Sequence, residues 1–155
     1  MTDLVSLGSV GTPLTVPQRA MWATQRRHRT SPLLNMAILT HLDGRVDVGR
    51  LIESFDTVVA KNRVLSHVVE ERSAGPVWVR PSRTTPTTEV IKLDRAETMA
   101  WAGDRAAVAI DPRQRTFDSV VVTHEDETCS WYLDLHHMAT DASSSALVFS
   151  LTAQE

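Results

Sequence analysis

Two adjacent histidines and an aspartate four residues later are the side chains with the clearest capacity for chemistry: His136, His137 and Asp141. An imidazole titrates near pH 6.5, so it can accept and return a proton during a reaction. A carboxylate in the tight loop that follows can orient a ring nitrogen, accept loop N–H groups, or pair with a cation from another element. The spacing leaves these three roles of Asp141 open.

Metal binding is the alternative chemistry, because His and Asp are common ligands. Neighbouring side chains on a strand point to opposite faces, so a single ion cannot easily take both histidines. The sequence places no cysteine and no third histidine at ligand spacing around them. The pattern therefore favours proton transfer over a metal site, and a polar residue that merely ends a strand is the structural alternative.

The residues around the pair predict a strand over 128–137 and a helix from Ser143. One face of this strand carries Trp131, Leu133, Leu135 and His137, and the other carries Tyr132, Asp134 and His136. An apolar setting disfavours a charged ring, so we expect His137 to be neutral and able to accept a proton. We expect His136 to be structural.

The rest of the chain predicts the elements that support this strand. Thr15 and Gln18 have capping-box spacing, and Asp47 is a plausible N-cap before an apolar stripe. We predict helices over 16–28, 48–59 and 94–108, strands over 35–42, 65–71, 76–80, 89–93 and 117–124, and an extended connector over 81–88. Helices on a mostly antiparallel or mixed sheet give an α/β (α+β) two-layer sandwich, with residues 15–155 as one domain after a flexible lead-in over 1–14.

Composition narrows the class of protein. The chain has 155 residues with 42% hydrophobic and 23% charged content, and its net charge of −3 favours neither nucleic acid nor an anionic membrane as a partner. Cys129 is the only cysteine and is expected to be an inert strand residue, which suits a reducing cytoplasm. No run of residues approaches the apolar length of a spanning helix, so we expect a cytoplasmic location.

Several motifs now point to a known family. The stretch HHMATDASS resembles the HHxxxDGxS signature of nonribosomal peptide synthetase condensation domains and related acyltransferases of the chloramphenicol acetyltransferase-like fold. Residues 15–22 resemble the LTPxQxxxW opening of such domains, 42–47 resemble their LxGxLD segment, and 116–118 resemble their PFD stretch. Order and spacing agree from about residue 14 onward, so the chain is identified as the N-terminal lobe of a condensation domain.

The resemblance implies a function and partners. In such domains the signature loop lies in a tunnel between two lobes, and an acyl group is transferred to make an amide or ester bond. His137 is then the catalytic residue, as general base or orienting group, while His136 and Asp141 organise the loop. No cofactor is expected to bind directly, because the substrates are carried on phosphopantetheine arms of carrier proteins. Carrier proteins or adjacent synthetase domains are therefore the expected partners.

Two positions depart from the family pattern. Ala142 stands where the signature has glycine, and Ser66 stands where the family has an arginine that pairs with the signature aspartate, so Arg63 or His67 would have to replace it. These departures favour a second hypothesis, a non-catalytic lobe that docks a neighbouring synthetase domain or carrier protein.

The second lobe is expected from a separate polypeptide, from a second copy in a homodimer, or from a longer parent chain of which this is a fragment. A remnant used for binding is the further alternative. The apolar residues of 146–151 are expected either to fold back on their own sheet or to be covered by another chain.

Overall fold

A four-stranded mixed sheet forms the centre of the molecule. The computed structural model describes residues 11–81 and 88–155. The strand order in the large sheet is β2-β7-β6-β5. These strands are β2 (Asn35–Leu42), β5 (Glu89–Lys92), β6 (Phe117–Thr123) and β7 (Cys129–His136). β7 is antiparallel to both β2 and β6, whereas β5 runs parallel to β6.

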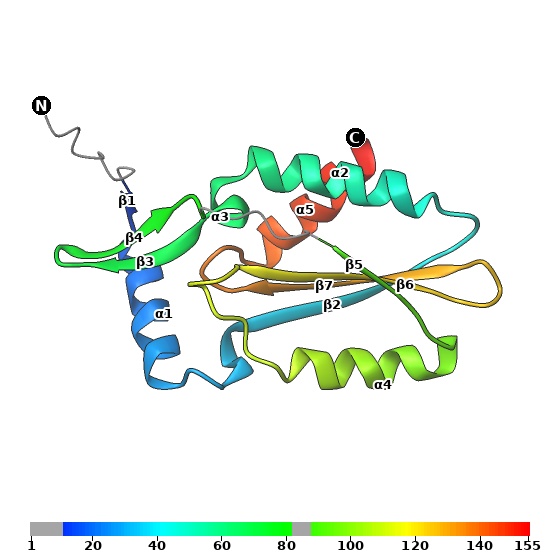
Figure 1. Ribbon diagram of the computed structural model, residues 1–155, viewed down its shortest axis with the longest axis horizontal. Coiled ribbons are helices and arrows are strands. Elements are labelled where there is room, and N and C mark those ends of the chain that lie inside the picture. Colours follow the sequence, from blue (N-terminus) through cyan, green and yellow to red (C-terminus); the bar gives the residue numbers. More distant parts are fainter. Residues whose placement is uncertain (1–10, 82–87) are drawn as a thin grey trace, which may run out of the picture.

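Helices cover both faces of this sheet. α2 (Val48–Lys61) and α5 (Ala142–Gln154) lie on one face, and α4 (Arg95–Ala106) lies on the other (Figure 1). Every residue of β7 is buried, because this central strand has a neighbour on each side and helices above and below. The mixed α/β fold with helices packed on its sheet is confirmed, and the expected alternation of side chains along β7 is present.

The core consists of separate apolar clusters. Between the sheet and the pair α2 and α5, Phe55 makes edge-to-face contacts with Phe117 and Trp131, with ring centroids 5.3 Å apart in each pair. On the other face, Trp101 of α4 meets Tyr132 at 5.4 Å. The sheet is therefore held by aromatic contacts from both sides.

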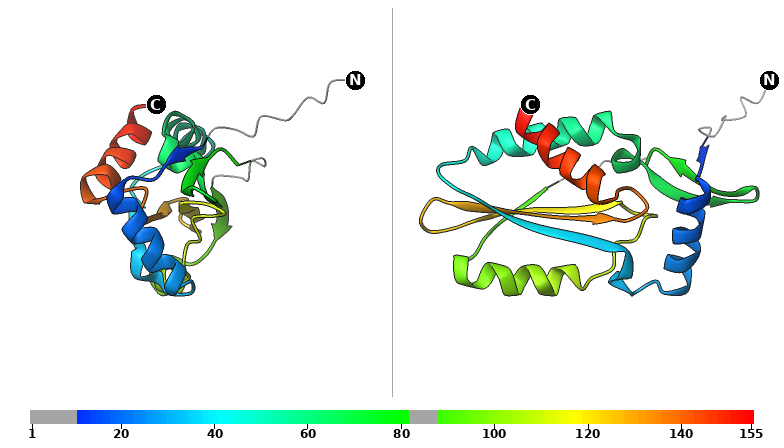
Figure 2. Two further views of the ribbon diagram at one scale, coloured as in Figure 1. Left: turned by 90° about the vertical axis from the view of Figure 1, so that its left-hand side faces the viewer. Right: turned by 180° about the vertical axis from the view of Figure 1, so that it is seen from behind.

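A smaller sheet stands at one end of the molecule, beside α1 (Val16–Arg27) (Figure 2). Its strands are β1 (Thr12–Pro13), β3 (Val68–Arg72) and β4 (Gly75–Val79), in the order β1-β4-β3. The third cluster joins this sheet and α1 to the loop after β7, through Leu14, Trp22, Val69, Trp78 and Met138. Trp22 and Trp78 are thus core residues, 4% and 3% exposed.

Local capping explains where the first two long helices begin. The Thr15 side chain accepts a bond from the backbone N–H of Gln18, and the Gln18 side chain accepts one from the backbone N–H of Thr15, which completes the predicted capping box. Asp47 caps α2 by accepting a bond from Arg50 N at 3.0 Å. Asp94 stands at the N-cap of α4, but its side chain makes no capping bond.

Two other boundaries differ from the sequence prediction. Leu65 and Ser66 close a short helix, α3 (Arg63–Ser66), instead of starting a strand, because their N–H groups bond back to Asn62 O. Leu14 is only 3% exposed and β1 pairs with β4, so residues 11–14 belong to the folded part. The first ten residues of the expected lead-in, and residues 82–87 of the connector, lie outside the described residues.

The apolar C-terminal segment folds back on its own sheet. In α5, Val148 is buried and Phe149 packs on Trp131 with ring centroids 4.8 Å apart. Leu151 lies against the same cluster, whereas Leu147 remains 56% exposed. Of the two outcomes expected for this segment, the structure takes the intramolecular one, so the segment no longer argues for a covering homodimer.

Candidate functional site

His136 ends β7 in a fully buried position. Its Nδ1 accepts a hydrogen bond from Met138 N at 3.1 Å, and its Nε2 donates to Gln25 Oε1 at 3.3 Å. Because the backbone N–H can only donate, the ring proton must lie on Nε2. Burial lowers the pKa of His136 to about 4, with a smaller effect from the neighbouring His137. The ring is therefore neutral and fixed near pH 7.

His137 points the other way and is only half-buried. Its Nδ1 lies 2.8 Å from the carbonyl oxygen of Thr140. A carbonyl accepts only, so Nδ1 must donate its proton, and in the neutral ring Nε2 keeps its lone pair. The sequence predicts that His137 is the more desolvated ring, but in the structure His136 is the more deeply buried one, because both faces of β7 are covered.

The loop that carries both rings, residues 136–141, is fixed through its backbone. His136 N donates to Thr116 O, His137 N donates to Leu34 O, and Ala139 N donates to His136 O, each at 2.8 Å. These bonds tie the end of β7 to the segments before β6 and β2. The loop therefore has a defined shape before any ligand binds.

α1 holds this loop at two points. Gln18 Nε2 donates to the carbonyl of Met138 at 3.2 Å, and Gln25 accepts the bond from His136. The other end of the Gln25 amide donates to backbone carbonyls after α1, the nearest being His28 O at 3.2 Å, which fixes the amide orientation. Two glutamines seven positions apart on one helix face thus clamp the loop.

Asp141 is an exposed helix cap in this structure. Its Oδ1 accepts bonds of 2.8 Å from both the backbone N–H and the hydroxyl of Ser144 in the first turn of α5. These bonds lower the pKa of Asp141. The sequence left three roles open for Asp141, and the structure shows the one in which it accepts loop N–H groups. Asp141 lies on the loop that carries the two histidines, but it bonds to neither ring.

The two departures from the family pattern have structural explanations. Ala142 is the first residue of α5 and its φ is not positive, so an alanine fits this backbone without strain. Ser66 bonds to Asn62 O within α3, Arg63 donates to Thr12 Oγ1, and His67 contacts Ser66. Within residues 11–81 and 88–155, no cation forms an ion pair with Asp141. Because the carboxylate is exposed, leaving it without a cation costs little.

Gln18 and Gln25 are the site residues whose role the sequence did not reveal. The helical spacing placed them on one face of the helix, but their partners lie 120 and 111 residues away in the chain. No local pattern reports a contact of that separation. The burial of Gln25, which is 6% exposed, is the structural sign that its amide has a specific partner.

The described parts of the chain show neither a metal-binding cluster nor a membrane-spanning helix. Neither stretch contains a group of three or more His, Cys, Asp or Glu side chains that could hold a metal ion. None of the helices within them has the length and apolar character to cross a membrane.

A mixed sheet that delivers two histidines and a helix-capping aspartate on one preorganised loop is the arrangement expected of the resembled acyltransferases. The family model described as "Condensation domain" matches residues 11–154. The chain therefore belongs to the condensation domain family.

Curated relatives agree with this assignment. The isonitrile lipopeptide synthase of Streptomyces coeruleorubidus is 28% identical over 145 residues, a match that covers 88% of this chain and 10% of the relative. The probable non-canonical nonribosomal peptide synthetase CymA of Salinispora arenicola is 26% identical over 137 residues, covering 86% of this chain and 2% of the relative. The chain thus spans a tenth or less of the length of these proteins.

Solved structures show the same fold. The starter condensation domain of rhizomide synthetase RzmA superposes with a TM-score of 0.84 at 18% identity, over 94% of this chain and 37% of that one. The first condensation domain of the calcium-dependent antibiotic synthetase, in complex with a substrate analogue, gives a TM-score of 0.80 at 22% identity, over 94% and 37%. This chain therefore corresponds to little more than a third of each of these structures.

Proposed function

We propose that this chain supplies the histidine-bearing lobe of a condensation-type acyltransferase in nonribosomal peptide or related natural-product biosynthesis. The donor is an acyl group on the phosphopantetheine arm of one carrier protein, and the acceptor is an amine or hydroxyl carried by another. Their reaction gives an amide or an ester. The resemblance to condensation domains implies a second lobe, which completes the site from whichever polypeptide provides it.

The observation that carries this proposal is the fixed tautomer of His137. With Nδ1–H bonded to the carbonyl of Thr140 at 2.8 Å, the free Nε2 lone pair is the basic atom of the loop. At Nε2 the ring can take the proton from the attacking amine or hydroxyl as the new bond to the acyl carbon forms, and can return it to the departing thiolate. His136 and Asp141 act by holding the loop in shape.

The test is acyl transfer from a carrier-bound or small thioester donor, measured with a complementary lobe present. We expect His137→Ala to lower the rate about 10²- to 10⁴-fold, the usual contribution of a general base. His28→Ala, at an exposed histidine at the end of α1, is the matched control and should keep the wild-type rate. Equal rates for His137→Ala and wild type would exclude His137 from catalysis.

A second candidate function is favoured by Asp141, which lacks the arginine partner of the family pattern. In this alternative the lobe docks a neighbouring synthetase domain or a carrier protein without catalysing transfer. Titration against the purified adjacent domain would then give a complex whose affinity is unchanged by His137→Ala, in a protein with no transfer activity. Failure to bind that domain would remove this alternative. The cytoplasmic location expected from the sequence stays a prediction under either function.

A further inference from the structure

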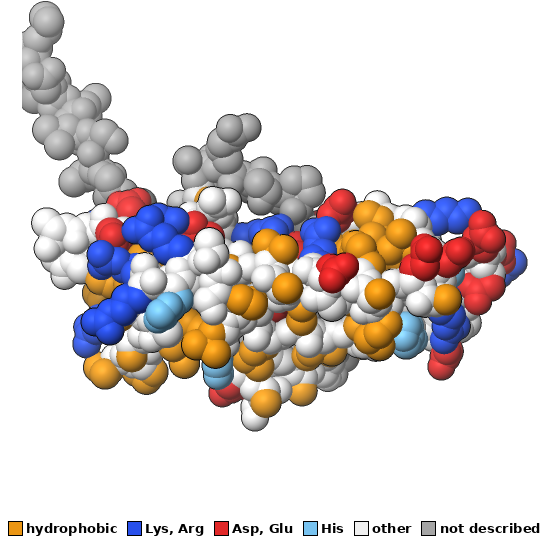
Figure 3. Space-filling model, turned by 90° about the horizontal axis from the view of Figure 1, so that it is seen from below, with side chains coloured by type: hydrophobic (Ala, Val, Ile, Leu, Met, Phe, Trp, Pro, Cys, Tyr) orange, Lys and Arg blue, Asp and Glu red, His pale blue; other side chains and the backbone are white. Residues whose placement is uncertain are grey.

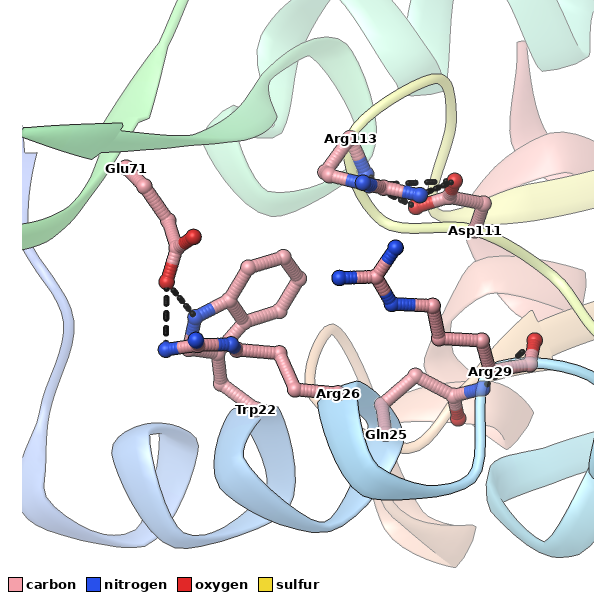
Figure 4. A pocket seen from close by; sticks show the side chains of 7 residues that line it. All are labelled: Trp22, Gln25, Arg26, Arg29, Glu71, Asp111 and Arg113. Atoms are coloured by element: carbon pink, nitrogen blue, oxygen red, sulfur yellow. Dashed lines mark hydrogen bonds and ion pairs between the residues drawn. The ribbon is translucent and has the colours of Figure 1, made fainter.

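A basic pocket lies beside Gln25, the residue that accepts the hydrogen bond from His136. Its empty volume is about 330 Å³, including space open to solvent, and its walls come from α1, the turn after it, β3 and the loop before β6. The lining residues are Trp22, Gln25, Arg26, Arg29, Glu71, Asp111 and Arg113 (Figure 4). Residues far apart in the sequence thus bring three guanidinium groups to one hollow.

Two of these arginines already have carboxylate partners. Arg26 NH1 lies 2.7 Å from Glu71 Oε1, which also accepts a bond from the indole N–H of Trp22 at 3.4 Å. Arg113 makes a two-pronged pair with Asp111, with NH2 at 2.6 Å from Oδ2 and Nε at 2.9 Å from Oδ1. Each guanidinium has five N–H donors, so each keeps donors to spare after its pair has formed.

Arg29 is the arginine whose charge is not matched. Its guanidinium lies in the hollow between the Trp22 indole and the Arg113–Asp111 pair (Figure 4). Within residues 11–81 and 88–155, this guanidinium forms no ion pair and donates no hydrogen bond. The pKa of Asp111 is lowered mainly by its hydrogen bond from Arg113, with a smaller contribution from the charge of Arg29. The five charged side chains of the pocket therefore sum to one net positive charge.

The charge of the surrounding surface has the same sign. Residues 16–29 contain four arginines, one histidine and no acidic residue, in a chain whose net charge is −3. Lys and Arg side chains gather at the end of the molecule where α1 lies, with a few acidic side chains among them, whereas side chains of both signs lie together at the opposite end (Figure 3). An anion is therefore drawn to the α1 end before it meets the pocket.

We propose that this pocket binds a phosphate group, free or as a phosphate ester, with Arg29 as its principal ligand. A phosphate presents several equivalent oxygens, so it can accept from Arg29 and from the spare donors of Arg26 and Arg113 together. A monovalent carboxylate can satisfy fewer of these donors and carries less charge, so it binds more weakly. The inference does not depend on the acyl-transfer function, because it concerns binding alone.

The test is a titration followed by two-dimensional proton–nitrogen NMR at low, constant ionic strength, with inorganic phosphate, methyl phosphate and acetate as separate probes. The indole N–H of Trp22 and Nε of Arg29 report directly on the pocket. We expect both to shift saturably with phosphate, and acetate to bind several-fold more weakly. Binding of methyl phosphate as well as inorganic phosphate would extend the site to phosphate esters, and binding of inorganic phosphate alone would restrict it to the free ion.

Three variants make the test specific. Arg29→Gln should raise the phosphate Kd about tenfold or more, the loss expected for charge-assisted bonds. Arg27→Gln removes the same charge from an exposed neighbour outside the pocket and should change Kd less than about twofold. Glu71→Gln keeps an acceptor for Trp22 but frees Arg26, and should tighten binding. Equal losses in Arg29→Gln and Arg27→Gln, or no saturable shift in the wild type, would overturn the proposal.

Discussion

On β7, the face toward α2 and α5 carries Trp131, Leu133 and Leu135, whereas the opposite face carries Tyr132, Asp134 and His136. Both faces are buried, yet the first is largely apolar, whereas the second contains Tyr132, Asp134 and His136, three ionisable side chains that are at most 1% exposed. The apolar face contributes stability mainly through packing, with one buried hydrogen bond from Trp131 Nε1 to Ser119 Oγ at 3.0 Å. The polar face depends on hydrogen bonds and on protonation state, and it is the face from which α1 fixes the signature loop.

On the polar face, burial favours the neutral forms of both Asp134 and His136. Burial raises the pKa of Asp134 to about 6, despite hydrogen bonds from Asn35 and Tyr132. Burial lowers the pKa of His136 to about 4. One strand thus shows that desolvation moves an acid and a base in opposite directions.

The largest loss of stability should come from a substitution on the apolar face. Leu135→Ala removes a side chain with no exposed surface and should lower the free energy of unfolding by about 2–5 kcal/mol. Leu147→Ala, at a 56% exposed leucine of α5, should change it by less than about 1 kcal/mol. Urea denaturation of both variants measures this difference. Similar losses in the two would mean that the packing of β7 does not stabilise the fold as described.

Substitutions on the polar face should instead change how the free energy of unfolding depends on pH. His136 has a pKa of 6.5 in the unfolded chain and about 4 in the folded one, so the unfolded state binds more protons between those values. Its contribution to stability therefore rises with pH in that window. Asp134 has a pKa of 3.8 unfolded and about 6 folded, so the folded state binds more protons there and its contribution falls with pH. Between about pH 4 and 6 the two slopes oppose each other.

Replacing either group should reveal how the other alone makes the free energy of unfolding depend on pH. From pH 4 to pH 7, Asp134→Asn should gain stability relative to wild type by on the order of 2–3 kcal/mol, and His136→Gln should lose a similar amount. Chemical denaturation at several pH values gives both trends as differences from wild type, so that titrations common to all three proteins cancel. Parallel pH profiles would show that neither group is perturbed by burial.

A smaller effect is expected at Asp141, where the loop meets α5. Asp141→Ala removes the cap of α5 and should lower the free energy of unfolding by about 1 kcal/mol, whereas Asp141→Asn keeps an acceptor and should lose only a few tenths. Thermal unfolding of these two variants shows whether Asp141 stabilises the protein as a helix cap or through its negative charge. If the asparagine variant were as unstable as the alanine variant, the negative charge and not the cap would be the stabilising feature.

Local signals in the sequence were enough to predict much of the fold. The predicted strand over 35–42 and the N-cap at Asp47 depend on neighbours within a few residues, and the structure has β2 and α2 at those places. The site was predictable only in part. The signature places His136, His137 and Asp141 on one loop, but which ring is buried depends on α1 and α4 packing against β7, and the Gln25 bond to His136 joins residues 111 positions apart.

In their neutral forms, the two histidines of the signature loop are held in opposite tautomers. Long-range proton–nitrogen correlation NMR of the imidazoles at about pH 8 measures this directly, with His136→Gln and His137→Ala to assign the signals. We expect Nδ1 of His137 and Nε2 of His136 to be protonated, and Nε2 of His137 and Nδ1 of His136 to carry free lone pairs or accept bonds. A proton on Nε2 of His137 would contradict the account, because the ring would then have no basic atom free to face a substrate.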